Sequence, residues 1–309
     1  LQIACVNLDR RPDRWEQFKK TTLHLSTPIA RFSAVDGYKL DIPLHPQLYH
    51  LFDTNDYNYR SGIVGCALSH MSLWIDYLYN PTSKKYLMVM EDDLYFNEKY
   101  VKDGVNFEDK VERCLATFEK LDGDIMCLQY TRRYPGGDDP DLKFIVVNSP
   151  SDALKYSYGG TGCYVITRRG VEKILAFINT HGMTNAIDTV IQKSAQVLKL
   201  IYVEPLLTVL DMGEADTDIQ NDFNHLNITI DNLIKHELKW LYQNYNLKLD
   251  VDFTINTTRL VDTAVYSYPL QHVWVNLTCP TSPKFKRERP NERLVVDGKF
   301  KLPPLLLLQ

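Results

Sequence analysis

Leu87-Met88-Val89-Met90-Glu91-Asp92-Asp93 is the stretch that decides the interpretation of this 309-residue chain. An apolar run of strand length ends in three consecutive carboxylates, which repel one another unless a cation offsets their charge. Mn²⁺ and Mg²⁺ bind carboxylate and phosphate oxygens together. We therefore predict a divalent-metal site at the end of a buried strand. An acidic loop or a helix N-terminus is the alternative interpretation.

Side chains alternate along an extended chain, so the three carboxylates face two ways. Glu91 and Asp93 project to one side, and Asp92 projects to the other. We expect Asp93 to be the principal metal ligand and Glu91 to be a direct or water-mediated second ligand. Asp92 is then placed to contact another part of the bound ligand.

The segments on either side of this stretch alternate between strand and helix patterns. Helical spacing of apolar residues begins at Pro12 and recurs at residues 64–79, 111–121, 171–178 and 188–197. Short apolar runs predict strands at residues 3–8, 29–34, 86–90, 125–128, 144–147, 163–166 and 200–203. This alternation is typical of an α/β fold with a mostly parallel sheet and helices on both faces. Its ligand site is expected at the carboxyl ends of the strands.

The length of the chain exceeds what one hydrophobic core usually supports. We predict one large α/β domain over residues 1–231 and an appended C-terminal subdomain over residues 232–309, where the pattern changes to shorter runs with prolines. Dimerisation or the binding of an acceptor is the role expected of that subdomain. Its basic cluster Lys284-Phe285-Lys286-Arg287 is interpreted as a solvated loop.

Composition excludes some classes of partner. A net charge of -4 gives no general attraction for nucleic acid or for an anionic membrane, and no apolar run approaches the roughly 20 residues of a membrane span. The six cysteines lack C-x-x-C spacing, so we expect buried thiols. Sequons at Asn227, Asn256 and Asn276 permit glycosylation in a secretory lumen and leave the compartment open.

Two further segments are candidates for binding an anionic ligand. Asn7-Leu8-Asp9-Arg10-Arg11-Pro12-Asp13-Arg14 places three arginines at a helix start, where a diphosphate is favoured. Pairing of these arginines with the neighbouring aspartates is the alternative. Gly62-Ile63-Val64-Gly65-Cys66-Ala67-Leu68-Ser69-His70 combines glycines that allow close backbone approach with two polar side chains. Helix packing explains the small residues of that segment equally well.

Taken together, these segments resemble glycosyltransferase family 25 over about residues 3 to 222. The motifs that carry the resemblance occur in the family's order: Asn7 to Arg14, Ala34-Val35-Asp36-Gly37, Gly65 to His70 with Trp74, Glu91-Asp92-Asp93 with Phe96, Tyr158 through Cys163-Tyr164-Val165-Ile166 to Gly170, and Val203-Glu204-Pro205-Leu206-Leu207. The last motif resembles the collagen-modifying branch in particular. Six motifs in order form a specific pattern.

The resemblance implies a GT-A type, Rossmann-like fold, a UDP-hexose donor, Mn²⁺ and inversion at the anomeric carbon. It assigns donor contacts to a set of residues in the first half of the chain: Asn7, Arg10, Arg14, Asp36, Gly65, Ser69, His70 and Asp92. The metal shell implied is Glu91 and Asp93, with Asp218 from a later acidic segment.

Inversion needs a base that takes the proton from the attacking hydroxyl. Asp188 lies where the family commonly shows an aspartate ahead of a helix, and we assign the base to it. The preceding Ala186-Ile187 departs from the family pattern, and a helix N-cap is the alternative role of Asp188. Tyr158-Gly159-Gly160 is a second departure, and its glycines predict an enlarged donor or acceptor pocket.

The resemblance leaves the acceptor open between two classes. The collagen branch implies hydroxylysine or galactosyl-hydroxylysine of a collagen-like peptide in the endoplasmic reticulum lumen, with galactose or glucose as the transferred hexose. The lipooligosaccharide branch implies a glycan acceptor, and a microbial or viral origin implies the cytoplasm. A catalytically silent binding module is a third hypothesis, and a metal-dependent phosphoesterase is a fourth. A homodimer is compatible with all of them.

Overall fold

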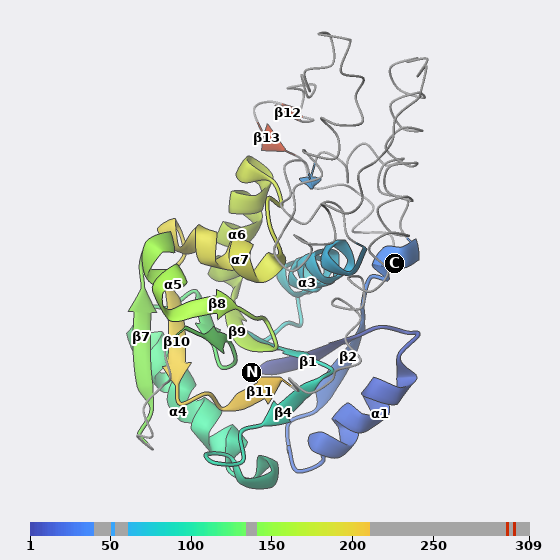
Figure 1. Cartoon of the computed structure of the whole chain (residues 1–309), viewed down its shortest axis with the longest axis vertical. Coiled ribbons are helices and arrows are strands. Elements are labelled where there is room, and N and C mark those ends of the chain that lie inside the picture. Colours follow the sequence, from blue (N-terminus) through green and yellow to red (C-terminus); the bar gives the residue numbers. More distant parts are fainter. Residues whose placement is uncertain (40–50, 53–60, 134–140, 211–294, 297–298, 301–309) are drawn as a thin grey trace, which may run out of the picture. The chain divides into compact units, whose positions relative to one another are not determined.

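The computed structural model describes residues 1–39, 51–52, 61–133, 141–210, 295–296 and 299–300 (Figure 1). The chain forms two compact units, of which the first comprises Leu1–Val35, Leu68–Phe177 and Ile187–Ala215. This first unit contains the sheet and the carboxylates discussed below. The predicted boundary at residue 231, Asp218, the three sequons and Cys279 lie outside the described residues.

A seven-stranded sheet is the frame of the first unit, in the order β2-β1-β3-β9-β5-β10-β7 within the described chain (Figure 1). Parallel pairs join β1 to β2, β1 to β3 and β5 to β10, whereas β9 and β7 run antiparallel to their neighbours. The mostly parallel sheet predicted from the sequence is confirmed. The strands are β1 (Gln2–Asn7), β2 (Ile29–Ser33), β3 (Tyr86–Glu91), β5 (Ile125–Cys127), β7 (Lys143–Val147), β9 (Cys163–Thr167) and β10 (Leu200–Glu204).

Helices cover both faces of the sheet, as the alternating pattern predicts. On one face, Met88 of β3 belongs to a buried cluster with Phe18 of α1 and Phe118 of α4. On the other face, Tyr164 of β9 is hydrogen-bonded to Trp74 of α3. The helices of the described chain are α1 (Pro12–Thr21), α3 (Ser61–Tyr79), α4 (Phe107–Lys120), α5 (Pro150–Tyr156), α6 (Arg168–His181) and α7 (Ile187–Lys193), with 3₁₀ turns η1 (Gly37–Lys39), η3 (Lys102–Gly104) and η4 (Ser194–Gln196). Among the described helices, none is long and apolar enough to cross a membrane.

Strand β3 is apolar throughout because both of its faces are covered. All five of its residues before Glu91 are buried, which is why the strand reads as a continuous run and not as an alternation. The described cysteines are free thiols, and Cys5, Cys114, Cys127 and Cys163 are buried as predicted. Burial raises the pKa of the Cys114 thiol to about 12.

Three short strand pairs of the described chain, separate from the seven-stranded sheet, were not predicted from the sequence. They are β4 (Leu94–Phe96) with β11 (Thr208–Leu210), β6 (Thr131–Arg132) with β8 (Ser157–Gly159), and β12 (Val295–Val296) with β13 (Lys299–Phe300). Strand β4 continues the chain just beyond the three carboxylates, and β8 leads to the Gly159-Gly160-Thr161 loop. The β4–β11 and β6–β8 pairs therefore border the carboxyl end of β3.

One buried carboxylate holds α6 to the start of two strands. Asp124 is inaccessible to solvent and accepts hydrogen bonds from Arg169 Nε at 2.6 Å and Lys173 Nζ at 2.7 Å, both on α6. It also accepts the backbone N–H of Lys199 at 2.9 Å, just before β10. Removing Asp124 would take away all three of these hydrogen bonds at once, two of them from charged donors.

We expect Asp124→Ala to lower the free energy of unfolding by about 3 kcal/mol, because Arg169 and Lys173 lose their buried partner. Urea denaturation at pH 7 measures the change. Asp122→Ala is the matched control, since Asp122 pairs with the same Arg169 but is largely exposed, and about 0.5 kcal/mol is expected. Equal effects of the two substitutions would contradict the role given to Asp124.

Candidate active site

The three carboxylates lie at the carboxyl edge of the sheet, beside the end of β1. Val6 pairs with Glu91 in the parallel β1–β3 ladder, so Asn7 is the next residue along that edge. Strand β9 runs antiparallel to β3, so its first residue, Cys163, pairs with Met90 at the same edge. The residues that follow β1 and β3 and those that precede β9 are therefore brought together.

Asp92 is held by two side chains of the β1–α1 segment. Its Oδ2 accepts from Asn7 Nδ2 at 2.6 Å, and its Oδ1 accepts from Arg14 Nη1 at 3.0 Å. Burial raises the pKa of Asp92, although the bond from Asn7 and the charge of Arg14 oppose that shift. Arg14 also lies 3.6 Å from Asp93 Oδ2. Part of the positive charge that the acidic stretch requires is therefore supplied by the protein itself.

The remaining arginines of the β1–α1 segment pair with aspartates or are exposed. Arg11 Nη2 lies 2.8 Å from Asp13 Oδ2, and this hydrogen bond lowers the pKa of Asp13 to about 2. Arg31 of β2 pairs with Asp9. The alternative interpretation, arginine–aspartate pairing, is thus confirmed for Arg11. Arg10 is exposed, and donor contacts of Asn7, Arg10 and Arg14 stay predictions.

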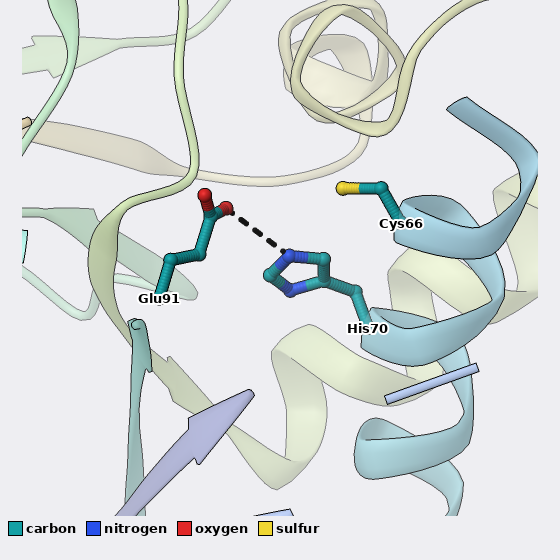
Figure 2. A group of neighbouring side chains, drawn as sticks. All are labelled: Cys66, His70 and Glu91. Atoms are coloured by element: carbon teal, nitrogen blue, oxygen red, sulfur yellow. Dashed lines mark ion pairs between the residues drawn. The ribbon is translucent and has the colours of Figure 1, made fainter. Parts of the chain in front are cut away.

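Glu91 is contacted from two elements through the same oxygen. Thr161 Oγ1 donates to Oε1 at 2.6 Å, and His70 Nε2 lies 3.4 Å from Oε1 (Figure 2). Burial would raise the pKa of Glu91, but the interactions with His70 and Thr161 outweigh it and the pKa is lowered. The side chain is 21% exposed. Glu91 is therefore an ionised carboxylate that remains accessible at the site.

Asp93 fits a divalent cation better than any other member of the acidic stretch. Its Oδ1 is buried and has no hydrogen-bond partner among the described residues. Burial and the nearby charge of Glu91 raise the pKa of Asp93 to about 7. An oxygen with an unmet need for positive charge, next to a second accessible carboxylate, is the donor chemistry that Mn²⁺ or Mg²⁺ takes.

Asp188 lies in the first turn of α7, and backbone N–H groups bind its carboxylate. Gly160 N donates to Oδ2 at 2.9 Å, and Thr189 N donates to Oδ1 at 2.6 Å. A helix N-cap accepts from the N–H two or three residues further on, whereas Thr189 is the next residue, so the cap alternative is wrong. Burial raises the pKa of Asp188, and the charge of Glu91 adds to the shift.

The two glycines before Thr161 leave space for their neighbours, and Gly159 makes room for Asp188. Gly159 has φ +133°, and a Cβ built there would lie 2.2 Å from Asp188 Oδ2. Gly160 has φ +105°, and its Cβ would crowd Gln129 and Tyr130. The predicted enlargement of a ligand pocket at Gly159 is therefore wrong, because the carboxylate of Asp188 occupies that space.

The Gly160-Thr161 dipeptide joins the two carboxylates that the sequence assigned to different roles. Gly160 binds Asp188 and Thr161 binds Glu91, so neighbouring residues fix both groups. A small cavity lies beside them, with room for little more than a water molecule, lined in part by Asp188, Thr161 and Gln192. Sequence reasoning missed the hydrogen bonds of both loop residues. The available signal was the pair of glycines just before a buried strand.

The other predicted donor contacts lie on α3 and after β2. Ser69 is buried and its Oγ accepts the N–H of Val35 at 2.8 Å, and His70 is also buried. Asp36 Oδ1 accepts from Tyr38 N at 3.2 Å. Gly65 and Asp36 belong to the second compact unit. Donor contacts of these four residues stay predictions, and the structure shows Ser69 and His70 in contacts within the protein.

The part of the chain that contains this site is similar to known proteins. The family model described as glycosyltransferase family 25 (LPS biosynthesis protein) matches residues 1–191. Procollagen galactosyltransferase 1-A of Xenopus laevis is 30% identical over 185 residues, 56% of this chain and 28% of that protein. Procollagen galactosyltransferase 2 of Homo sapiens is 26% identical over 186 residues, 56% of this chain and 27% of that protein.

A glycosyltransferase 25 family member of Aedes aegypti is 28% identical over 184 residues, again 56% of this chain and 27% of the relative. The matched segments therefore span under a third of each of these three relatives. The matched part of the chain contains β1, β3 and the Glu91-Asp92-Asp93 stretch.

We expect Asp93→Asn to stabilise the metal-free protein at pH 8 by about 2 kcal/mol, because ionised Asp93 is buried next to Glu91. The pKa of Asp93 is raised from 3.8 to about 7, so its ionisation costs stability as pH rises from about 4 to about 7. The advantage of the variant should grow across that window and stay constant above it.

Urea denaturation in EDTA at pH 4, 6 and 8 measures the difference between wild type and Asp93→Asn. Asp13→Asn is the control, since the pKa of Asp13 is lowered and its loss should not stabilise the protein at any of these values. A destabilised Asp93→Asn protein at pH 8 would contradict the unmet charge at Asp93.

Proposed function

Since the chain belongs to glycosyltransferase family 25, we propose that it is an inverting, metal-dependent hexosyltransferase acting on a hydroxyl acceptor. The donor is UDP-galactose or UDP-glucose, and the acceptor is hydroxylysine or galactosyl-hydroxylysine of a collagen-like peptide. The observation that carries the proposal is the pair of hydrogen bonds made by two adjacent residues: Gly160 donates to Asp188, and Thr161 donates to Glu91. A base and a metal-binding carboxylate must stand close together for direct displacement at one carbon.

Asp188 has the properties of a general base. Its carboxylate has a raised pKa, so it accepts a proton more readily than an exposed aspartate does. In the proposed step, Asp188 takes the proton of the acceptor hydroxyl while the hydroxyl oxygen bonds to the anomeric carbon. The bond from that carbon to the diphosphate oxygen breaks, and its electron pair leaves with UDP. The bonds from Gly160 and Thr189 hold the carboxylate in one orientation during this transfer.

Glu91 and Asp93 are the residues that would hold Mn²⁺. When bound, the ion supplies Lewis-acid neutralisation of the diphosphate leaving group. Asp218 is proposed to complete the metal shell. Arg14 and Asn7 orient Asp92, which we propose contacts the donor sugar or its ribose. Arg10, Asp36 and Gly65 are proposed as further donor contacts.

The acceptor proposal draws support from the relatives, two of which carry the name procollagen galactosyltransferase. A glycan acceptor is the second candidate, because the description of the matching family names lipopolysaccharide biosynthesis. The two acceptors differ in chemistry, since hydroxylysine presents an isolated hydroxyl on a peptide and a glycan presents several on a ring. A single assay separates them.

The test incubates the protein and Mn²⁺ with UDP-galactose or UDP-glucose and three acceptors. These are a collagen-like peptide with hydroxylysine, the same peptide with lysine, and a panel of sugars. Mass spectrometry should show a gain of one hexose on the hydroxylysine peptide, none on the lysine peptide, and loss of transfer in EDTA. Transfer to sugars alone would contradict the collagen acceptor and support a glycan acceptor. Failure to bind UDP with Mn²⁺ in calorimetry would favour the silent binding module.

We expect Asp188→Asn to lower kcat by about 100-fold or more while UDP affinity changes by less than about twofold, because the amide cannot take the proton. Steady-state kinetics and calorimetry with UDP measure the two quantities. If Asp188→Asn has the kcat of the wild type, the general base is a residue other than Asp188.

Gly159→Ala should lower kcat, as Asp188→Asn does, although Asp188 is kept. The new Cβ would lie 2.2 Å from Asp188 Oδ2 and would force the carboxylate to move. We expect kcat to fall by about tenfold or more. Gly104→Ala is the control, since Gly104 also has a positive φ of +74° but its Cβ would meet the Phe96 ring. An equal fall in kcat in both variants would show that backbone strain at a positive φ, and not the position of Asp188, causes the loss of turnover.

A further inference from the structure

Three buried side chains form a chain of polar contacts that ends at Glu91. Trp74 Nε1 donates to Tyr164 Oη at 2.8 Å, and His70 Nδ1 lies 2.8 Å from the same oxygen. The other ring nitrogen of His70, Nε2, lies 3.4 Å from Glu91 Oε1 (Figure 2). His70 and Trp74 are inaccessible to solvent, and Tyr164 is 2% exposed. The chain therefore runs from the protein interior to an accessible carboxylate.

The direction of the hydrogen bonds follows from what each group can donate. An indole N–H is a donor alone, so Tyr164 Oη accepts from Trp74 and its own proton is available for His70 Nδ1. In the other neutral tautomer the proton is on Nδ1, and the lone pair of Nε2 faces the Glu91 carboxylate. The lone pair and the carboxylate repel each other, and this repulsion is costly in a buried environment. The geometry therefore assigns a proton to His70 Nε2, pointing at Glu91.

The contacts of Glu91 leave one of its oxygens for a ligand. Both His70 and Thr161 contact Oε1. Oε2 receives no hydrogen bond from the described residues, and in Figure 2 it is turned away from His70. Cys66 lies one helical turn before His70 on α3, on the same side of that helix (Figure 2). A carboxylate fixed through one oxygen presents the other in a defined direction.

We propose that Trp74, Tyr164 and His70 are positioning residues that fix the orientation of Glu91 and so present its Oε2 to the metal of the donor site. The proposal rests on the function proposed above, since it requires a cation at Glu91 and Asp93. It explains why a histidine and a tryptophan one turn apart on α3 are buried with polar atoms directed at one tyrosine hydroxyl. Partners of this kind orient a ligand and typically change metal affinity by ten- to a hundredfold when removed.

Tyr164→Phe tests the proposal because it removes one hydroxyl and keeps the ring. We expect Mn²⁺ affinity, measured by electron paramagnetic resonance with MnCl₂ in the presence of UDP, to fall about tenfold. Tyr77→Phe is the matched control. Tyr77 is a buried tyrosine of α3 whose hydroxyl donates to the carbonyls of Lys84 and Lys85, and its loss should leave Mn²⁺ affinity within about twofold. Equal Mn²⁺ affinity of wild type and Tyr164→Phe would overturn the proposal.

A second measurement uses the metal-free wild type and needs no variant at Tyr164. In ¹⁵N spectra of histidine-labelled protein, with the His70 signals identified by their loss in His70→Gln, Nε2 should carry a proton. A neutral His70 with its proton on Nδ1 would overturn the proposal. If wild type binds no Mn²⁺, the metal site of the proposed function fails and the positioning role fails with it. If wild type binds Mn²⁺ and Tyr164→Phe binds it equally, the positioning role fails alone.

Discussion

The repulsion among three consecutive carboxylates at the end of a buried strand is the constraint on which the rest of this site depends. The negative charge of each carboxylate is compensated to a different extent. Asp92 is held by Asn7 and Arg14, and Glu91 receives His70 and Thr161 on one oxygen. Asp93 keeps a buried oxygen with no partner among the described residues. The demand for positive charge is thereby concentrated on one side of the stretch.

Much of the first unit follows from its sequence. Continuous apolar runs such as β3 mark strands covered on both faces, and the alternation with helical spacing gives the mostly parallel sheet. The position of the acidic stretch at a strand end was predicted for the same reason. The short pairs β4–β11 and β6–β8 were not, because two- or three-residue strands are defined by their partners and carry no period of their own.

The side-chain contacts of the site were less predictable, because they join residues far apart in the chain. Glycines at Gly159 and Gly160 suggested space for a ligand, yet a positive φ and the Asp188 carboxylate account for them. His70 was predicted to contact a donor, and its buried contact with the Tyr164 hydroxyl was not foreseen. Arginines near a helix start can bind an anion or a neighbouring aspartate, and the structure shows the aspartate partner for Arg11.

Removing the charge of Asp93 is expected to favour folding of the metal-free protein, so the presence of all three carboxylates needs another cause. Burial and the charge of Glu91 raise the pKa of Asp93, and its Oδ1 has no hydrogen-bond partner among the described residues, whereas the fully buried Asp124 has three donors. Sites of binding and catalysis are where proteins keep such destabilising groups. The contrast between these two aspartates within one sheet therefore separates a carboxylate that serves the fold from one that is available to a ligand.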